Sequence, residues 1–123
     1  MEIARSLAIS FKGGETILLY GELGAGKTVF AKGIAQGLEI SENIVSPTFM
    51  LVREYHSGLL PLYHFDMYRI TDESELTEIG IDEYFDDNSV RVIEWNKLKD
   101  VRGKIITVKI ETVGENERWI EIF

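Results

Sequence analysis

The chain has 123 residues, of which 45% are hydrophobic, and this length predicts a single domain over residues 1–123. It contains no cysteine, which excludes a disulfide framework and a Cys-ligated metal site. The net charge of −8, and the lack of a basic apolar leader or an apolar run of about 18 residues, argue against nucleic-acid and membrane binding. We therefore expect a cytoplasmic protein that binds no nucleic acid directly.

The first elements indicate a strand followed by a helix. Residues 2–10 fit a helix or a strand equally well, and a glycine turn follows at residues 12–14. The short apolar run over residues 16–20 predicts a buried strand. A helix is expected from about Lys27 to Leu38, since its apolar residues recur at the spacing of one helix face: Phe30, Ala31, Ile34, Ala35 and Leu38.

Between this strand and helix lies Gly-Glu-Leu-Gly-Ala-Gly-Lys-Thr, from Gly21 to Thr28, which fits the phosphate-binding pattern G-x-x-x-x-G-K-[ST]. The glycines let backbone N–H groups approach phosphate oxygens, and the helix N-terminus favours an anion. Lys27 supplies a positive charge for the outer phosphates, and the Thr28 hydroxyl is a ligand for Mg²⁺. The predicted nucleotide-binding residues are Glu22, Leu23, Gly24, Ala25, Gly26, Lys27, Thr28 and Val29.

Residues 49–55 and 59–68 predict two strands of a hairpin, joined by a turn at residues 56–58. In the second strand, Tyr63, Phe65 and Met67 alternate with His64, Asp66 and Tyr68. One face is therefore apolar, and the other carries an imidazole, a carboxylate and a phenol. His64 is either a packed core histidine or a functional residue, whereas His56 beside the turn is expected to be exposed.

Residues 72–87 hold eight acidic residues and no Lys or Arg, while the rest of the chain holds 13 of each charge. This segment is either a solvated surface or a docking face for a basic partner protein. Asp72 and Glu75 resemble a helix-capping pair, so a helix is expected over residues 73–79. Gly80 should end it, and residues 81–85 predict a further helical turn.

Residues 89–95 predict a strand that ends at a carboxylate, Glu94, and residues 96–102 a loop or short helix. The last two strands are expected over residues 104–113 and 117–123. In the first of these, Ile106, Val108 and Ile110 alternate with polar residues, which is typical of an antiparallel strand with one wet face.

Catalysis by a phosphate loop also needs carboxylates near the magnesium ion. Asp66 and Glu94 are the candidates, and either is able to bind the metal directly, hold it through water, or orient the attacking water. The segment from Asn96 to Asp100 imitates the guanine-reading Asn-Lys-x-Asp pattern, but its Asp comes one residue late. This favours ATP over GTP.

Together these segments resemble the TsaE (YjeE) family, the small bacterial ATPases of the threonylcarbamoyladenosine pathway of tRNA modification. The resemblance covers roughly residues 13–95, and its most specific parts are Ser-Pro-Thr and His-x-Asp-x-Tyr-Arg. The matching segments are residues 21–28, Ser46-Pro47-Thr48, residues 63–69, residues 78–85 and Ile93-Glu94-Trp95.

The resemblance implies an α/β P-loop fold with a small mixed sheet, a parallel core and antiparallel strands, flanked by helices. It also implies ATP and Mg²⁺ binding with weak ATP hydrolysis. Thr28, Asp66 and Glu94 match family positions at the metal, and Lys27 one at the phosphates. Thr48 lies in a switch-like segment where it would sense the γ-phosphate. Family members act with TsaB and TsaD, so tRNA is engaged only indirectly.

Two other functions remain open from the sequence, namely a small-molecule kinase and a nucleotide-dependent interaction module without turnover. The arginines are scattered rather than gathered in a lid, which disfavours a kinase. No arginine occupies an obvious catalytic-finger position, so a partner would supply or arrange one, with Arg69 as the internal candidate.

Overall fold

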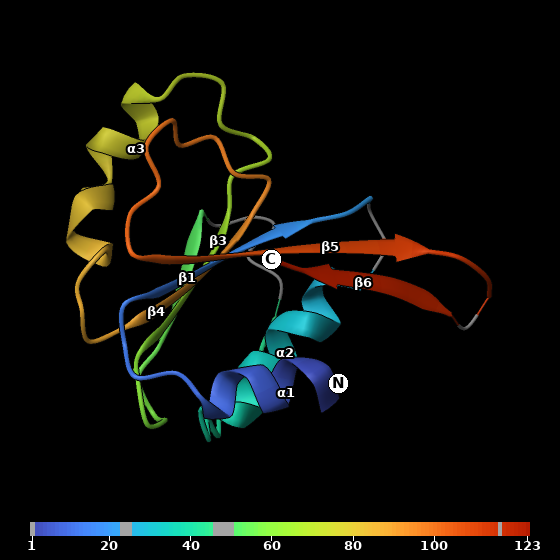
Figure 1. Ribbon diagram of the computed structural model, residues 1–123. Coiled ribbons are helices and arrows are strands. Elements are labelled where there is room, and N and C mark those ends of the chain that lie inside the picture. Colours follow the sequence, from blue (N-terminus) through green and yellow to red (C-terminus); the bar gives the residue numbers. More distant parts are fainter. Residues whose placement is uncertain (1, 23–25, 46–50, 116) are drawn as a thin grey trace.

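The computed structural model describes residues 2–22, 26–45, 51–115 and 117–123 (Figure 1). In chain order its elements are α1 (Glu2–Ile9), β1 (Glu15–Tyr20), α2 (Lys27–Gly37), β2 (Val52–Tyr55), β3 (Leu62–Asp66), α3 (Ser74–Glu78), the 3-10 helix η1 (Ile81–Tyr84), β4 (Val90–Glu94), β5 (Lys104–Thr112) and β6 (Arg118–Ile122). The strands form one six-stranded sheet in the order β2-β3-β4-β1-β5-β6.

The centre of this sheet is parallel and its edges are antiparallel. Strands β3, β4, β1 and β5 run in the same direction, whereas β2 is antiparallel to β3 and β6 to β5. The predicted small mixed sheet of a P-loop fold is therefore confirmed. The expectation of an antiparallel strand for β5 is only half right, because β5 is antiparallel to β6 but parallel to β1.

Helices α1 and α2 pack together on one face of the sheet (Figure 1). Residues 2–10, which left helix and strand open, form α1 for most of their length. The close contact with α2 depends on Gly37, since a Cβ there would lie 2.5 Å from the Cβ of Ala8 and 2.6 Å from the carbonyl oxygen of Arg5. No helix in the described ranges is long and apolar enough to span a membrane.

The opposite face is covered by α3, η1 and the segment that follows β4. Leu76 and Ile81 from these short helices pack with Phe65 and Ile93 of the sheet. Gly80, with a φ of 71°, separates α3 from η1 as predicted. Most acidic side chains of residues 72–87 are exposed, which both a solvated surface and a docking face require.

Since both faces are covered, the polar alternation in β3 does not mark a solvent-facing side. His64 is fully buried, and every residue of β4 is buried as well. Central parallel strands are normally buried on both faces. His64 in the middle of β3 therefore lies inside the protein, whereas Asp66 at the end of the strand is half-buried.

Candidate functional site

Strands β3, β4 and β1 are parallel neighbours, and their carboxyl ends lie side by side along one side of the sheet. Asp66 ends β3 and Glu94 ends β4, and these two residues are paired in register. On its other side Glu94 pairs with Leu19 of β1, just before the phosphate loop begins. The sheet thus brings both predicted carboxylates beside this loop, at the edge where open α/β sheets bind ligands.

The described part of the phosphate loop leads directly into α2. Gly26 adopts a left-handed conformation with a φ of 101°, and Lys27 is the first helical residue. The first N–H groups of a helix lack partners within it, so this end of α2 suits an anion. Thr28 is half-buried, whereas Glu22 and Val29 are exposed. Other predicted loop and switch residues lie outside the described residues, namely Leu23, Gly24, Ala25, Ser46, Pro47 and Thr48.

Lys27 is buried between the loop and the end of β4, with 5% of its surface exposed. Its Nζ donates a hydrogen bond to the carbonyl oxygen of Gly21 at 2.9 Å and lies 3.7 Å from the centre of the Trp95 ring. Burial lowers the pKa of the Lys27 ammonium, while the negative charges of Glu94 and Asp66 act to raise it. The lysine is therefore within electrostatic reach of both carboxylates.

Glu94 is 4% exposed, and its Oε2 accepts a hydrogen bond from the Nε2 of His64 at 2.6 Å. With Glu94 as a carboxylate, which only accepts, the imidazole Nε2–H is the donor of this bond. The structure thus joins one of the two metal candidates to the histidine whose role the sequence left open. The two side chains come from adjacent strands but lie 30 residues apart in the chain.

Asp66 is half-buried, and its Oδ1 accepts a hydrogen bond from the backbone N–H of Tyr68 at 3.0 Å. The Tyr68 ring is exposed and meets the Trp95 ring edge-on, with 5.0 Å between the ring centres. The two carboxylates are therefore held by different donors, a backbone amide for Asp66 and an imidazole for Glu94.

Trp95 is a site residue that the sequence reasoning did not assign. Its φ of 56° is uncommon for a residue other than glycine, and such backbone outliers often lie at functional sites. Trp95 follows Glu94 directly, and its ring packs against the ammonium of Lys27. The sequence signals that pointed to it were its position just after a strand-ending carboxylate and its place in the family-like segment Ile93-Glu94-Trp95.

Two adjoining cavities open beside the phosphate loop. Tyr20, Gly21 and Trp95 line both of them, and Lys27 lines the smaller, which measures about 220 Å³. The larger measures about 580 Å³ and extends along the end of β5 at residues 109–112. A hollow of this size, with a lysine at one end, suits a nucleotide whose phosphates reach the loop.

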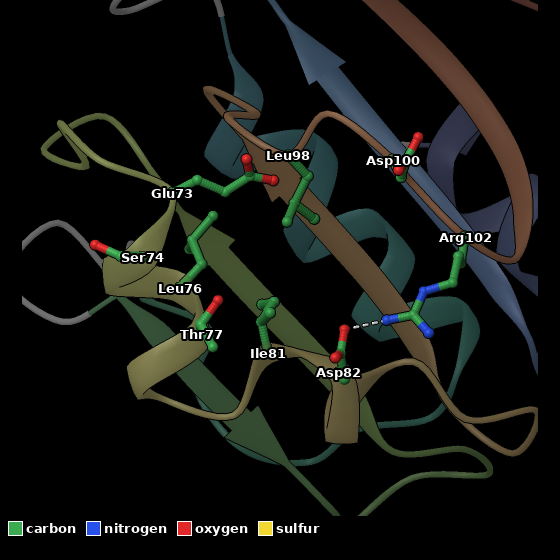
Figure 2. Close-up of a pocket in the computed structure, with 9 residues that line it drawn as sticks. All are labelled: Glu73, Ser74, Leu76, Thr77, Ile81, Asp82, Leu98, Asp100 and Arg102. Carbon is green, nitrogen blue, oxygen red and sulfur yellow. Dashed lines mark hydrogen bonds and ion pairs between the residues drawn. The ribbon is translucent and has the colours of Figure 1, made fainter.

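A third cavity, of about 540 Å³, lies between α3, η1 and the segment before β5 (Figure 2). It is lined in part by the carboxylates of Glu73, Asp82 and Asp100. Among the described residues that line it, Arg102 is the one cation, and it forms an ion pair with Asp82. This acidic cavity would repel a triphosphate, so the candidate site is the hollow beside the phosphate loop.

Mg²⁺ prefers oxygen ligands, which the Thr28 hydroxyl and the carboxylates of Asp66 and Glu94 provide. The described residues contain no group of three or more His, Cys, Asp or Glu side chains able to hold a metal by themselves. The donor set therefore fits an ion that keeps phosphate and water oxygens among its ligands, as Mg²⁺ does at nucleotide sites.

Two other residues from the sequence reasoning, His56 and Arg69, have exposed side chains. His56 is exposed, as expected, and its Nε2 lies 3.2 Å from an oxygen of Glu54. Arg69 is exposed in the turn after β3, three residues beyond Asp66.

Comparison with known proteins places these residues in a defined family. The family model described as "Threonylcarbamoyl adenosine biosynthesis protein TsaE" matches residues 1–120. The tRNA threonylcarbamoyladenosine biosynthesis protein TsaE of Bacillus subtilis is 44% identical over 120 residues, covering 96% of this chain and 75% of that protein. The protein of the same name from Treponema pallidum is 39% identical over 111 residues, covering 89% of this chain and 82% of that protein.

A solved structure shows the same fold. The crystal structure of YdiB from Bacillus subtilis matches with a TM-score of 0.74 at 37% sequence identity, covering 96% of this chain and 73% of that chain. The family match over residues 1–120 therefore includes β5 and the first part of β6, which lie beyond the residues covered by the resemblance seen in the sequence.

Proposed function

Because this chain belongs to the TsaE family, we propose that it is a magnesium-dependent ATPase that serves the threonylcarbamoyladenosine modification of tRNA. The observation that carries the proposal is the meeting of Lys27, Asp66 and Glu94 at one sheet edge beside the phosphate loop. This combination supplies a phosphate-binding cation, oxygen ligands for a metal, and a group to orient water. The products are ADP and inorganic phosphate.

Each residue has a distinct part in this proposal. Lys27 binds the outer phosphates, and Thr28 and Asp66 hold the magnesium ion, whose charge offsets that of the phosphates. Glu94 orients the attacking water, because His64 already occupies one of its carboxylate oxygens. Thr48 would report the presence of the γ-phosphate.

The reaction forms a bond between the water oxygen and the γ-phosphorus, and breaks the bond from that phosphorus to the oxygen it shares with the β-phosphate. The electron pair of the broken bond stays on ADP. The proton released by the water goes to the departing phosphate, while Glu94 accepts a hydrogen bond from the water and sets its direction of attack.

The partners in this proposal are proteins resembling TsaB and TsaD, whose complex the ATPase would act on or reset between turnovers. The acidic chain supports a protein partner rather than tRNA itself, since binding to a polyanion needs a basic face. Hydrolysis by the isolated chain is expected to be weak, because a partner would complete or arrange the catalytic groups.

Phosphate release, measured with Mg-ATP in the presence and absence of purified TsaB and TsaD, tests the proposal. We expect release to rise with the partners and to be lost in Lys27→Ala and Glu94→Ala. Glu2→Gln, at an exposed carboxylate on α1 outside the acidic segment, is the matched control and should behave as wild type. Absence of release from the wild type with its partners would contradict the proposal.

The contacts of Lys27 favour one alternative, a nucleotide-dependent interaction module without turnover. Its ammonium must leave Gly21 and Trp95 to reach a phosphate, so binding alone would rearrange the loop. Partner binding that needs ATP, persists in Glu94→Ala and produces no phosphate would support this alternative. Transfer of the γ-phosphate to a small acceptor would instead identify a kinase and exclude both.

A further inference from the structure

His64 and Glu94 face each other on the side of the sheet that α2 covers. His64 shares its face of β3 with Leu62, and Glu94 shares its face of β4 with Val92; both of these neighbours belong to the core beneath α2. Strands β3 and β4 are adjacent and parallel, with His64 paired to Val92. This register lets the imidazole reach forward to the carboxylate at the end of the neighbouring strand.

The environment of His64 is not that of a residue chosen for packing alone. Its side chain has no exposed surface, yet its Nδ1 has no hydrogen-bond partner among the described residues. A buried polar atom without a partner is costly, and an apolar side chain would fill the same space without that cost. The one hydrogen bond that the imidazole makes to the described residues goes to Glu94.

We propose that His64 is a positioning residue that fixes the orientation of the Glu94 carboxylate. Its Nε2–H holds Oε2, and the other oxygen, Oε1, remains available to direct the attacking water. This inference rests on the proposed function, because it assigns His64 to the same hydrolysis step. The orientation of the Glu94 carboxylate then depends on where the Nε2–H of His64 lies and in which direction it points. An apolar core neighbour, which has no such donor, could not take this role.

Two substitutions with amide side chains of different length test whether the position of the N–H donor matters. In His64→Gln the side-chain nitrogen lies about as far along the side chain as the imidazole Nε2, whereas in His64→Asn it stops short. His64→Leu removes the donor and keeps the volume. His56→Leu is the matched control, because His56 also lies 3.2 Å from a glutamate oxygen but is exposed and remote from the loop.

The test measures kcat for ATP hydrolysis with TsaB and TsaD present, and the Kd for Mg-ADP, in each variant. We expect His64→Leu and His64→Asn to lower kcat about 10- to 100-fold, as misplacement of a catalytic group does, with Kd changed less than about twofold. His64→Gln should restore most of the rate, and His56→Leu should match wild type. In a Glu94→Gln background, His64→Leu should cause no further loss.

A wild-type kcat in His64→Leu or His64→Asn would overturn the inference. It would also be overturned if His64→Leu lowered kcat by the same factor in the wild-type and Glu94→Gln backgrounds. If His64→Leu does not fold, the contrast between His64→Gln and His64→Asn decides the matter. If wild type itself releases no phosphate, the proposed function fails separately. In that case, crystal structures of wild type and His64→Leu test the inference. A Glu94 carboxylate that is oriented differently in His64→Leu would support the inference, and an unchanged orientation would overturn it.

Discussion

The ammonium of Lys27 lies 3.7 Å from the centre of the Trp95 ring, so the lysine of the phosphate loop and the residue after Glu94 are in direct contact. The same ammonium donates a hydrogen bond to Gly21 within the loop. We expect both contacts to compete with a phosphate for the lysine, because the carbonyl oxygen and the ring each occupy part of the ammonium's surroundings.

This competition predicts that Trp95→Leu binds Mg-ADP more tightly than wild type. A cation–π contact contributes about 0.5–1 kcal/mol, which corresponds to a gain of roughly two- to fivefold in affinity. Isothermal titration calorimetry provides the Kd. Trp119→Leu, at the exposed tryptophan of β6, is the control and should not change it. Weaker binding by Trp95→Leu would show that the ring contacts the nucleotide instead of competing with it.

The assignment of Thr28 to the metal predicts a loss of affinity that depends on magnesium. Thr28→Val keeps the shape of the side chain but removes the hydroxyl ligand. A polar contact to a charged group contributes about 1.5–3 kcal/mol, so we expect affinity for ADP to fall roughly tenfold or more with Mg²⁺. In EDTA the two proteins should bind alike. An equal loss under both conditions would reject a metal-binding role.

The order of elements from β1 onward could largely be predicted from local sequence, because most boundaries carry their own signal, whereas residues 2–10 left helix and strand open. Gly80 ends α3, the glycine loop separates β1 from α2, and apolar runs mark the central strands. Glu94 was expected to end a strand and does end β4. Asp66 was expected inside a strand over residues 59–68, whereas in the structure it ends β3 in register with Glu94.

Contacts between distant segments could not be read in the same way. The bond between His64 and Glu94 spans 30 residues and depends on which strands are neighbours and in which register. The parallel pairing of β5 with β1 likewise leaves no mark in the alternation of β5 itself. The position of Trp95 depends on a single left-handed backbone angle, which no local pattern specifies.

Arg91 is the clearest structural residue that the sequence did not reveal, since it is 1% exposed in the centre of the sheet. Its guanidinium donates hydrogen bonds to the hydroxyl of Thr16 and to the carbonyl oxygens of Gly14 and Asp86. Burial lowers the pKa of Arg91, and nearby acidic groups, with Asp86 foremost, oppose this shift. These contacts join the segment before β1 to the loop before β4.

Arg91→Leu should therefore lower the free energy of unfolding by about 3 kcal/mol or more, since it removes the hydrogen bonds of a buried guanidinium to Thr16, Gly14 and Asp86. Urea denaturation measures the change. Arg118→Leu, at an exposed position on β6, should change it by less than about 0.5 kcal/mol. If both variants lose the same small amount, the network around Arg91 does not stabilise the fold.

The start of α3 predicts a dependence of stability on pH. The Glu75 carboxylate accepts hydrogen bonds from the backbone N–H groups of Thr71 and Asp72, and these bonds lower its pKa below the ordinary value of 4.5. A lowered folded-state pKa stabilises the protein above the ordinary value, and the contribution is lost as pH falls through the folded-state value.

Glu75→Gln should consequently be less stable than wild type at pH 7, and the difference should shrink as the pH falls below 4.5. Thermal denaturation over this pH range measures it, with Glu78→Gln as the exposed control. A difference that stays constant with pH would show that the charge of Glu75 is not involved.

The most direct test of the account compares binding and turnover in Glu94→Gln. The central claim is that the loop with Lys27 binds the nucleotide, whereas Glu94 acts on the water. The measurement is the Kd for Mg-ATP together with kcat for hydrolysis in the presence of TsaB and TsaD. The account predicts a Kd within about threefold of wild type and a kcat reduced about 100-fold or more. A normal kcat in this variant would contradict it.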